Sequence, residues 1–486
     1  MRPTVVVHYL GSLLVLMGGL MLVPFGVSVL YGESDRLALL TSALITAAVG
    51  GTAWVLTRKQ PGPMMRKESF LVVALGWALA SAFGALPYML AGTFTSFVDA
   101  YFEAMSGFTT TGSSVLADIE AQPHGILLWR GFTQWLGGMG IIALFIALVP
   151  LTRIGAAGAS SLFEDEAPAP QVDRVTPRIR DTAKALWVIY SVMTLALVIL
   201  LVLVGMPLFD SIANTFGTMA TGGFSPRNAS IAYYRNPAAE WIIVAFMALA
   251  GTNFGLYYLM WRGKIRKALA DTELKVYFAI LAGCSLLVAI DLMANAGYTS
   301  FLEAIRFSSF QVVSQQTTTG FMTADFDQWP WFSKTILLLV MFIGASSGST
   351  GGALKVVRLV IVSKYAHRQL YNVFHPRVVL PIKMGGRVVP EGIVRESVAF
   401  FIVYQSIFLF STIALTALGI DFISALSGVA ATLGNVGPGL AMVGPTMNFS
   451  PMPDLAKVIF TFDMYVGRLE LWTVLILLRP AFWREP

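Results

Sequence analysis

The stretch FTTTGSS, residues 108–114, decides the fold, because it does not suit the membrane helix in which so apolar a chain would place it. Three threonines and a glycine stand in a sequence of which 56% is apolar and 12% is charged. A second copy, QTTTGFM, occupies residues 316–322. A polar run that recurs at such a distance indicates an internal repeat, and internal repeats determine the architecture.

The composition is typical of a helical protein that crosses a membrane many times. The 486 residues have a mean hydropathy of +0.71, and several stretches are long enough to cross a hydrocarbon core of about 30 Å. The first stretch could be a signal peptide, but it is too long and leads directly into a second span. We predict ten spans, near residues 5–30, 37–57, 70–91, 126–151, 185–205, 239–260, 276–294, 332–362, 397–418 and 456–478.

The basic residues indicate the orientation of the chain. They cluster between alternate pairs of spans, at residues 58–67, 174–184, 262–267 and 364–387. Loops rich in lysine and arginine stay on the cytoplasmic side of a membrane. Ten spans therefore place both termini in the cytoplasm, and the net charge of +6 is a topology signal and not a sign of nucleic-acid binding.

Several kinds of chemistry are excluded by the residues that the chain lacks. The single cysteine, Cys284, excludes an internal disulfide, and four scattered histidines have no metal-ligand spacing. There is no phosphate-binding loop, no dinucleotide fingerprint and no paired acid and base. We therefore predict that the chain is not an enzyme and binds no cofactor of its own, so that energy comes from ion gradients or from a partner.

Four outer loops share one pattern. Each starts with an acidic residue (Asp99, Asp210, Glu303, Asp421), continues as a short helix and reaches a glycine (Gly112, Gly222, Gly320, Gly437). The repeating unit is a span, a short helix, a glycine loop and a second span. We expect an all-α membrane protein with an extra pair of spans in residues 1–60, followed by four parallel repeats in residues 61–155, 156–265, 266–375 and 376–486 around a central pseudo-four-fold pore.

The glycine loops have the residue types of an ion-selectivity filter. Irregular backbone at membrane depth survives only where it is buried in protein or lines a water-filled cavity. Glycine lets neighbouring carbonyls point inward, and the negative end of each short helix would face a cation. The segments contain no charge, which favours a site of backbone carbonyls like that of potassium channels. The predicted filter comprises Thr110, Thr111, Gly112, Ala220, Thr221, Gly222, Thr318, Thr319, Gly320, Asn435, Val436 and Gly437.

The alternative interpretation of these loops is ordinary helix packing, in which small polar residues let helices approach closely. One copy alone would favour packing, whereas four copies on one side of the membrane favour a filter. Parallel repeats disfavour alternating access by inverted halves but leave ion coupling open. Since the repeats are sequential, the loops at 110–112 and 318–320 are expected to face each other.

The eighth span contains a second irregular segment, GASSGSTGGA at residues 344–353. Each glycine costs about 1 kcal/mol in a helix interior, so the helix should break there, either for close packing or as a gate across the ion path. Arg468 lies in the tenth span, where a buried arginine needs a pore or a partner. We predict that it donates hydrogen bonds to residues 344–353; the alternative is an ion pair with Asp463 or Glu470. The predicted gate comprises Gly344, Ser346, Ser347, Gly348, Ser349, Thr350, Gly351, Gly352 and Arg468.

Other polar residues receive lesser roles. Arg130 and Gln134, near the outer end of the fourth span, are expected to be packing or interfacial residues. Asn253 suits pore lining and a hydrogen bond between helices equally well. The acidic cluster Glu164–Glu166 and the following APAPQ are expected to form a solvated cytoplasmic loop.

These motifs resemble those of the Trk/Ktr/HKT superfamily of cation transporters, and of its TrkH type above all, over nearly the whole chain. FTTTG, QTTTGF and NVGPG match the first, third and fourth filters of that family, ATGGFS fits the second, and TPRIRDTAKALW and YVGRLE match other stretches. The resemblance implies potassium uptake across a bacterial inner membrane. Glycine at all four filters, Gly112 included, implies potassium and not sodium selectivity, while Pro438 makes the four-fold symmetry approximate.

The resemblance also implies regulation and partners. It places an intramembrane gating loop at residues 344–353 and implies a homodimer. It further implies a cytoplasmic ring of TrkA-like subunits that bind NAD or ATP and dock on the basic inner loops. Two modes of transport stay open: a gated, channel-like path for potassium, and obligatory symport of potassium with protons or sodium.

Overall fold

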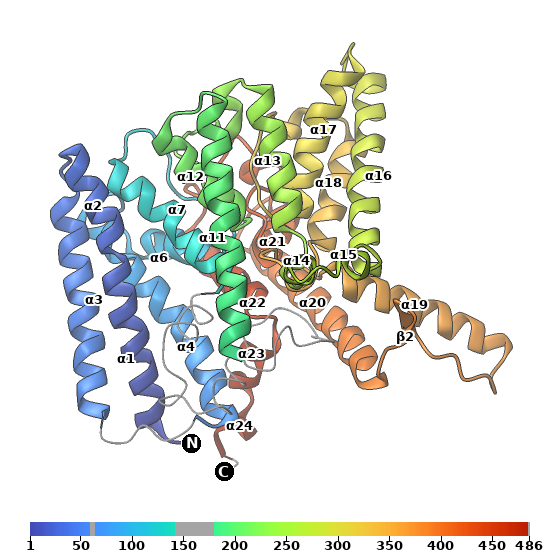
Figure 1. The fold of residues 1–486 in the computed structure, drawn as a ribbon, viewed down its shortest axis with the longest axis horizontal. Coiled ribbons are helices and arrows are strands. Elements are labelled where there is room, and N and C mark those ends of the chain that lie inside the picture. Colours follow the sequence, from blue (N-terminus) through green and yellow to red (C-terminus); the bar gives the residue numbers. More distant parts are fainter. Residues whose placement is uncertain (59–63, 141–178, 485–486) are drawn as a thin grey trace.

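The computed structural model describes residues 1–58, 64–140 and 179–484, and their regular structure is almost wholly helical (Figure 1). The strands within these ranges form one antiparallel pair, β1 (Lys383–Met384) and β2 (Arg387–Val388). Six helical segments of the described residues are long and apolar enough to cross a membrane, and they confirm the first, second, third, fifth, seventh and ninth predicted spans. They are Pro3–Tyr31, Arg36–Thr57, Lys67–Leu90, Ala183–Leu203, Thr272–Asn295 and Glu391–Ala417.

The N-terminal helices form a closely packed pair at one side of the molecule (Figure 1). The first span consists of α1 (Pro3–Leu20) and α2 (Leu22–Tyr31), and α3 (Arg36–Thr57) returns beside it. Glycines let α1 and α3 approach, since a Cβ added at Gly11 would lie 2.8 Å from the carbonyl oxygen of Gly50. Small residues at such contacts are typical of helix pairs in membranes.

Four short helices follow the outer ends of spans, as the repeat pattern predicts. Each carries its acidic residue in the first turn or, for Asp421, at the N-cap, where the carboxylate accepts a hydrogen bond from the Ser424 amide at 3.0 Å. An acidic group at this end complements the helix dipole. The short helices are α6 (Phe97–Phe108), α12 (Leu208–Met219), α17 (Phe301–Gln316) and α21 (Phe422–Leu433).

The helix that returns from each glycine loop is also short. Each begins at or just after a proline, which suits the first turn of a helix, and each ends after 13 to 15 residues. That length is too small to cross a membrane alone. These four returning helices are α7 (His124–Gly138), α13 (Pro237–Ala250), α18 (Trp331–Ile343) and α22 (Asp454–Arg468).

Two of the predicted spans are therefore wrong as continuous helices. In the sixth span, α13 gives way to α14 (Phe254–Trp261) through a bend of 91°. In the tenth, α22 ends at Arg468, and two successive left-handed residues, Glu470 (φ 54) and Leu471 (φ 52), precede the short helix α23 (Trp472–Leu475). Neither break has a glycine-rich sequence like the one that predicted the break in the eighth span.

The predicted break in the eighth span is confirmed. Helix α18 ends at Ile343, directly before Gly344, and α19 (Val356–Phe374) starts after an irregular stretch. In the fourth predicted span, α7 ends at Gly138. The part of this span after residue 140 lies outside the described residues, together with the acidic cluster Glu164–Glu166 and part of the basic clusters at 58–67 and 174–184.

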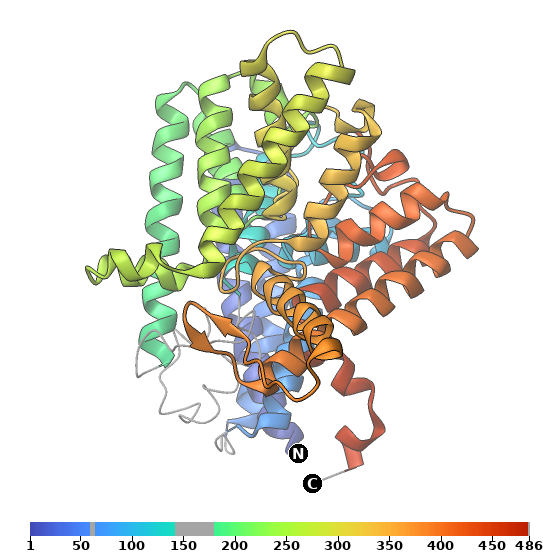
Figure 2. The same ribbon diagram turned by 90° about the vertical axis from the view of Figure 1, so that its right-hand side faces the viewer.

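The remaining elements complete the frame. Both ends of the chain lie at the lower end in Figure 1, and Figure 2 shows α19 and the β1–β2 hairpin on the viewer's side. The other helices are α4 (Arg66–Gly84), α5 (Leu86–Leu90), α11 (Ile179–Leu203), α15 (Ile265–Leu269), α16 (Thr272–Asn295), α20 (Glu391–Ala417) and α24 (Pro480–Arg484), with 3-10 turns η1 (Ser230–Tyr234), η2 (Phe326–Gln328), η3 (Ala441–Val443) and η4 (Ile476–Leu478).

Candidate ion filter and gate

The four glycine loops have the same backbone conformation. A residue with positive φ follows each short helix, and a glycine with positive φ comes two residues later. Residues other than glycine rarely adopt positive φ, so the recurrence in all four loops reflects a common structure. The first positions are Thr110 (54°), Thr221 (52°), Thr318 (61°) and Asn435 (54°), and the second are Gly112 (83°), Gly223 (77°), Gly320 (79°) and Gly437 (109°).

The predicted register of the second loop is wrong by one residue. The sequence interpretation took Ala220–Gly222 as the equivalent of Thr110–Gly112, whereas the backbone makes Thr221–Gly223 equivalent. Ala220 instead caps the C-terminus of α12 with right-handed helical angles. Two adjacent glycines, Gly222 and Gly223, left the register open in the sequence.

Two successive backbone N–H groups in each loop donate hydrogen bonds to the end of the preceding short helix. Thr110 N donates to Gly107 O at 3.0 Å and Thr111 N to Ser106 O at 2.9 Å, so both bonds return to the short helix of the same repeat. Bonding the N–H groups backward leaves the carbonyls free for another partner. The equivalent bonds in the other loops are Thr221 to Thr218, Gly222 to Gly217, Thr318 to Gln315, Thr319 to Ser314, Asn435 to Thr432 and Val436 to Ala431.

The loops form a closed ring in chain order. A Cβ added at Gly112 would overlap the carbonyl oxygen of Gly222 in the next loop, so only glycine fits there. The same contact joins Gly223 to Thr319 O, Gly320 to Val436 O and, closing the ring, Gly437 to Thr111 O. The first and third loops thus each contact the second and fourth, which confirms that they face each other.

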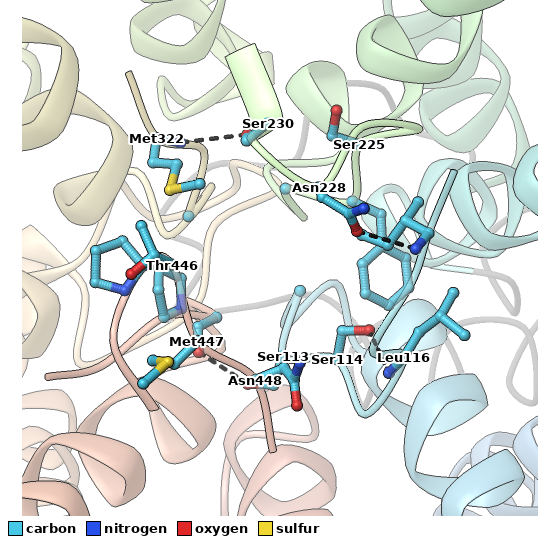
Figure 3. A pocket seen from close by; sticks show the side chains of 18 of the residues that line it. Ser113, Ser114, Leu116, Ser225, Asn228, Ser230, Met322, Thr446, Met447 and Asn448 are labelled. Atoms are coloured by element: carbon cyan, nitrogen blue, oxygen red, sulfur yellow. Dashed lines mark hydrogen bonds between the residues drawn. The ribbon is translucent and has the colours of Figure 1, made fainter. Parts of the chain in front are cut away.

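A cavity of about 160 Å³ opens on one side of this ring. All four left-handed glycines line it, together with residues that follow them in each loop (Figure 3). Figure 3 shows Ser113, Asn228, Met322 and Thr446 around the opening, one from the outer arm of each loop. The cavity is one mouth of the candidate ion path.

Arg130 lies in the wall of this mouth, although the sequence interpretation gave it a packing or interfacial role. Its Nε donates to Glu103 Oε1 at 2.8 Å, and both side chains are buried. Arg130 also donates to Ser114 Oγ at 3.2 Å, and Glu103 accepts from the Val115 amide at 2.9 Å. This buried ion pair therefore fastens the outer arm of the first loop to its own short helix.

Gln134, also expected only to pack, contacts the second loop. Its Nε2 donates to Gly222 O at 2.5 Å, and its Oε1 accepts from the Phe224 amide at 2.9 Å. The partners are about ninety residues away in the sequence. In the sequence, Gln134 stood out only as a carboxamide in an apolar span, and this did not identify its partner.

Residues 344–353, which we call the gate loop, lie against the inner side of the ring. Gly352 N donates to Thr318 Oγ1 at 2.9 Å, and Thr221 Oγ1 donates to Thr350 Oγ1 at 3.1 Å. A Cβ added at Gly352 would lie 2.5 Å from the carbonyl oxygen of Gly434, just before the fourth filter segment. The gate loop thus contacts the second, third and fourth loops.

The gate loop is held by the broken end of α13 and by α16. Ser346 N donates to Gly251 O at 2.9 Å, while Gly348 O accepts from the Phe254 amide at 3.0 Å. The side chain of Asn253 caps α14 by accepting from the Gly255 amide at 2.8 Å, and it lies beside Gly348 of the gate loop. The break in the sixth span therefore frees backbone groups of Gly251 and Phe254, and the gate loop forms hydrogen bonds with them.

Arg468 connects the gate loop to a second broken helix. It donates to Thr350 O at 2.8 Å, which confirms the predicted hydrogen bond, and to Gly137 O at 2.6 Å and Gly138 O at 2.9 Å at the end of α7. Helix ends leave such carbonyls without intrahelical partners. Of the acidic residues in the alternative, Glu470 pairs with Lys355 at 2.8 Å and with Arg358, and Asp463 accepts from Ser411 at 2.8 Å.

The next question is whether side chains could hold a metal ion. Among the described residues, no group of three or more histidine, cysteine, aspartate or glutamate side chains could hold a metal ion. The polar groups of the ring include backbone carbonyls, threonine hydroxyls and the side-chain amide of Asn435. Such oxygens suit a weakly held, dehydrated monovalent cation.

Many apolar spans, a ring of glycine loops at the end of four short helices and an irregular loop beneath the ring define the class of membrane cation transporters. The chain belongs to the TrkH family of cation transport proteins, whose model matches residues 36–484. This membership confirms the predicted family, and it confirms a transporter and not an enzyme.

Individual relatives match over their full length. The chain is 38% identical over 483 residues, 99% of each protein, to the Trk system potassium uptake protein TrkH of Escherichia coli strain K12. It is 38% identical over 485 residues, 99% of each, to the TrkH of Vibrio parahaemolyticus. The crystal structure of the potassium transporter TrkH from Vibrio parahaemolyticus matches with a TM-score of 0.89 and 36% identity, covering 100% of both chains.

Proposed function

We propose that the protein takes up potassium through a filter of backbone carbonyls that four loops supply around a pseudo-four-fold axis. The observation that carries the proposal is the closed ring, in which the glycine of each loop abuts a carbonyl of the next. Carbonyl oxygens in such a ring replace the hydration shell of a potassium ion. Relatives that share the full length of the chain are named potassium uptake proteins, which supports potassium as the ion.

The proposed architecture is an N-terminal pair of spans in residues 1–60 and four parallel repeats in the rest of the chain. Each repeat contributes a long span, a short helix, a filter loop and a returning helix. The proposed location is a bacterial inner membrane with both termini in the cytoplasm, which the positive-inside rule supports. The marked ends of the chain lie close together in Figure 1, in agreement with an even number of crossings.

The gate loop and Arg468 together close the path in this proposal. The gate loop covers the inner side of the filter through its contacts with Thr318 and Thr221. Arg468 adds a positive charge there, and a fixed positive charge in a narrow path repels cations. Movement of the gate loop would break the hydrogen bond between Arg468 and Thr350 O and would remove the loop from the path.

Regulation and assembly complete the proposal. We infer a homodimer and a TrkA-like cytosolic ring, binding NAD or ATP, that acts on the basic inner surface. The inner helix α19 continues directly from the gate loop, so a force on α19 would reach the loop. The alternative mode of transport is obligatory potassium symport with protons or sodium.

Electrical recording from the purified full-length protein in lipid bilayers tests the proposal and separates the two modes. A channel-like path predicts a reversal potential at the potassium Nernst value, unchanged when a proton or sodium gradient is imposed. A reversal potential that moves with either gradient at fixed potassium would establish coupled symport instead. Absence of potassium current and flux, in protein whose thermal unfolding shows that it is folded, would overturn potassium uptake.

A further inference from the structure

The second filter loop differs from the others at one position. Its middle residue is Gly222, where the first, third and fourth loops have Thr111, Thr319 and Val436. Gly222 is not one of the left-handed glycines, so its backbone conformation is open to other residues. The obstacle is a neighbour instead: a Cβ added at Gly222 would lie 2.6 Å from Cδ of Gln134 and 2.8 Å from its Nε2.

Gln134 occupies the space where the other loops carry a side chain, and it uses both ends of its amide there. The side chain is fully buried. Its donor reaches the carbonyl of Gly222 at 2.5 Å and its acceptor receives the amide of Phe224 at 2.9 Å. One carboxamide thus bridges the left-handed Gly223, and these two bonds fix which end is oxygen and which is nitrogen.

The hydrogen bond makes one carbonyl of the ring unlike the other three. The carbonyls of Thr111, Gly222, Thr319 and Val436 occupy equivalent places, each against a glycine of the neighbouring loop. In the described part of the chain, the oxygen of Gly222 accepts a side-chain hydrogen bond and those of the other three accept none. A carbonyl that already accepts a strong hydrogen bond has one lone pair fewer for a cation.

We propose that Gln134 is a positioning residue of the filter, which replaces the missing side chain of the second loop and weakens the field of one ring carbonyl. The inference rests on the proposed function, because it assigns Gln134 a part in the preference for potassium over sodium. The number and field strength of coordinating carbonyls contribute to this selectivity, and a stronger field favours the smaller ion. Releasing the Gly222 carbonyl should therefore move the preference toward sodium.

A single substitution with a matched control tests the effect on selectivity. Gln134→Met keeps the length of the side chain without a donor. With reconstituted full-length protein, the ratio of potassium to sodium influx should fall about threefold to tenfold in Gln134→Met, the factor that one net hydrogen bond is worth. Gln122→Met is the matched control: Gln122 bonds Thr93 in an outer loop, and the ratio should not change.

A double substitution tests the steric part. Gly222→Ala alone should lose most transport, since its Cβ meets the amide of Gln134, whereas Gly222→Ala combined with Gln134→Ala should recover much of it. A double variant as inactive as Gly222→Ala, or an unchanged ion ratio in Gln134→Met, would overturn the inference. A wild-type protein that does not prefer potassium would overturn the proposed function, while the change of ion preference between wild type and Gln134→Met still tests the role of Gln134.

Discussion

The filter loops and the gate loop are both irregular backbone inside the protein, but they are supported in opposite ways. Each filter loop bonds back to its own short helix, as Thr111 N does to Ser106 O five residues earlier. The gate loop bonds to distant elements, as Ser346 does to Gly251 and Ser347 to Glu273. Hydrogen bonds within one repeat are kept when other parts of the protein move. Hydrogen bonds to a distant helix are lost when that helix and the loop separate.

The difference sets how easily each loop can change its conformation. A filter loop also has a glycine pressed against a carbonyl of the next loop, so it has little space in which to move. The gate loop is held by separate hydrogen bonds, each with a net value of about 1 kcal/mol between neutral groups and about 1.5–3 kcal/mol where the charged Arg468 is the donor. A conformational change that costs only a few such bonds is within reach of a regulatory partner. In the proposed function, selectivity therefore belongs to the rigid loops and gating to the releasable one.

The largest effect is expected from disturbing the rigid ring. In Gly223→Ala, the new Cβ would overlap the carbonyl oxygen of Thr319 while the residue is forced to keep φ near 77°. Potassium influx into proteoliposomes should fall more than tenfold, because that clash and the strained backbone together cost more than about 1.4 kcal/mol. Gly297→Ala is the matched control, since Gly297 also has positive φ (74°) but has open space around it. Equal flux in both variants would mean that the ring is not rigid.

The next effect is expected from releasing the gate loop. Arg468→Ala removes the positive charge and the hydrogen bonds to Thr350, Gly137 and Gly138, so basal potassium flux without any partner protein should rise several-fold. Arg468→Lys keeps the charge but has a single ammonium group in place of the planar fork, and should give an intermediate flux. Arg479→Ala changes an arginine near the C-terminus and should leave the flux unchanged. Unchanged basal flux in Arg468→Ala would remove Arg468 from the gate.

A smaller effect is expected at Glu273. Its Oε1 accepts from Ser347 N at 2.7 Å inside the gate loop and from Val357 N at 3.1 Å just beyond it, so one carboxylate holds both ends of the loop. The amide oxygen of a glutamine could still accept such bonds, whereas an alanine could accept neither. Glu273→Gln should therefore raise basal flux by less than Arg468→Ala does, and Glu273→Ala by more than Glu273→Gln. Glu303→Gln, at the exposed start of α17, is the control, and a rise there as well would make the effect one of charge alone.

The same contrast explains how much could be predicted from the sequence. The ring was predictable because its support is local: an acidic residue, three helical turns and a glycine recur in each of the four copies. The break at Gly344 was visible because glycine and serine are poor helix formers. The breaks after Ala250 and at Glu470 could not be predicted from composition. The groups that bond the chain at these breaks lie in or beside the gate loop, far away in the sequence.

The register of the second loop could not be predicted from its own sequence. Its sequence, Ala220-Thr221-Gly222-Gly223, fits two registers, and the choice between them depends on Thr319 in the third loop and Gln134 in the first repeat. Neither neighbour can be identified by periodicity or composition. The sequence therefore predicts which residue types form the filter, whereas the contacts between repeats decide which of them face the ion path.

The smallest effect is expected where local support can be weakened without touching either loop. Asp421 caps α21, the short helix of the fourth loop, through the Ser424 amide at 3.0 Å. Asp421→Ala should lower the stability of the protein by about 1 kcal/mol, the usual value of an N-cap, and Asp421→Asn by less because asparagine caps as well. Thermal unfolding in detergent measures this loss, and proteoliposome flux should show unchanged ion preference and unchanged basal gating. A basal flux as high as that of Glu273→Ala would mean that the short helices also control the gate, and that the filter and the gate loop are not separately supported.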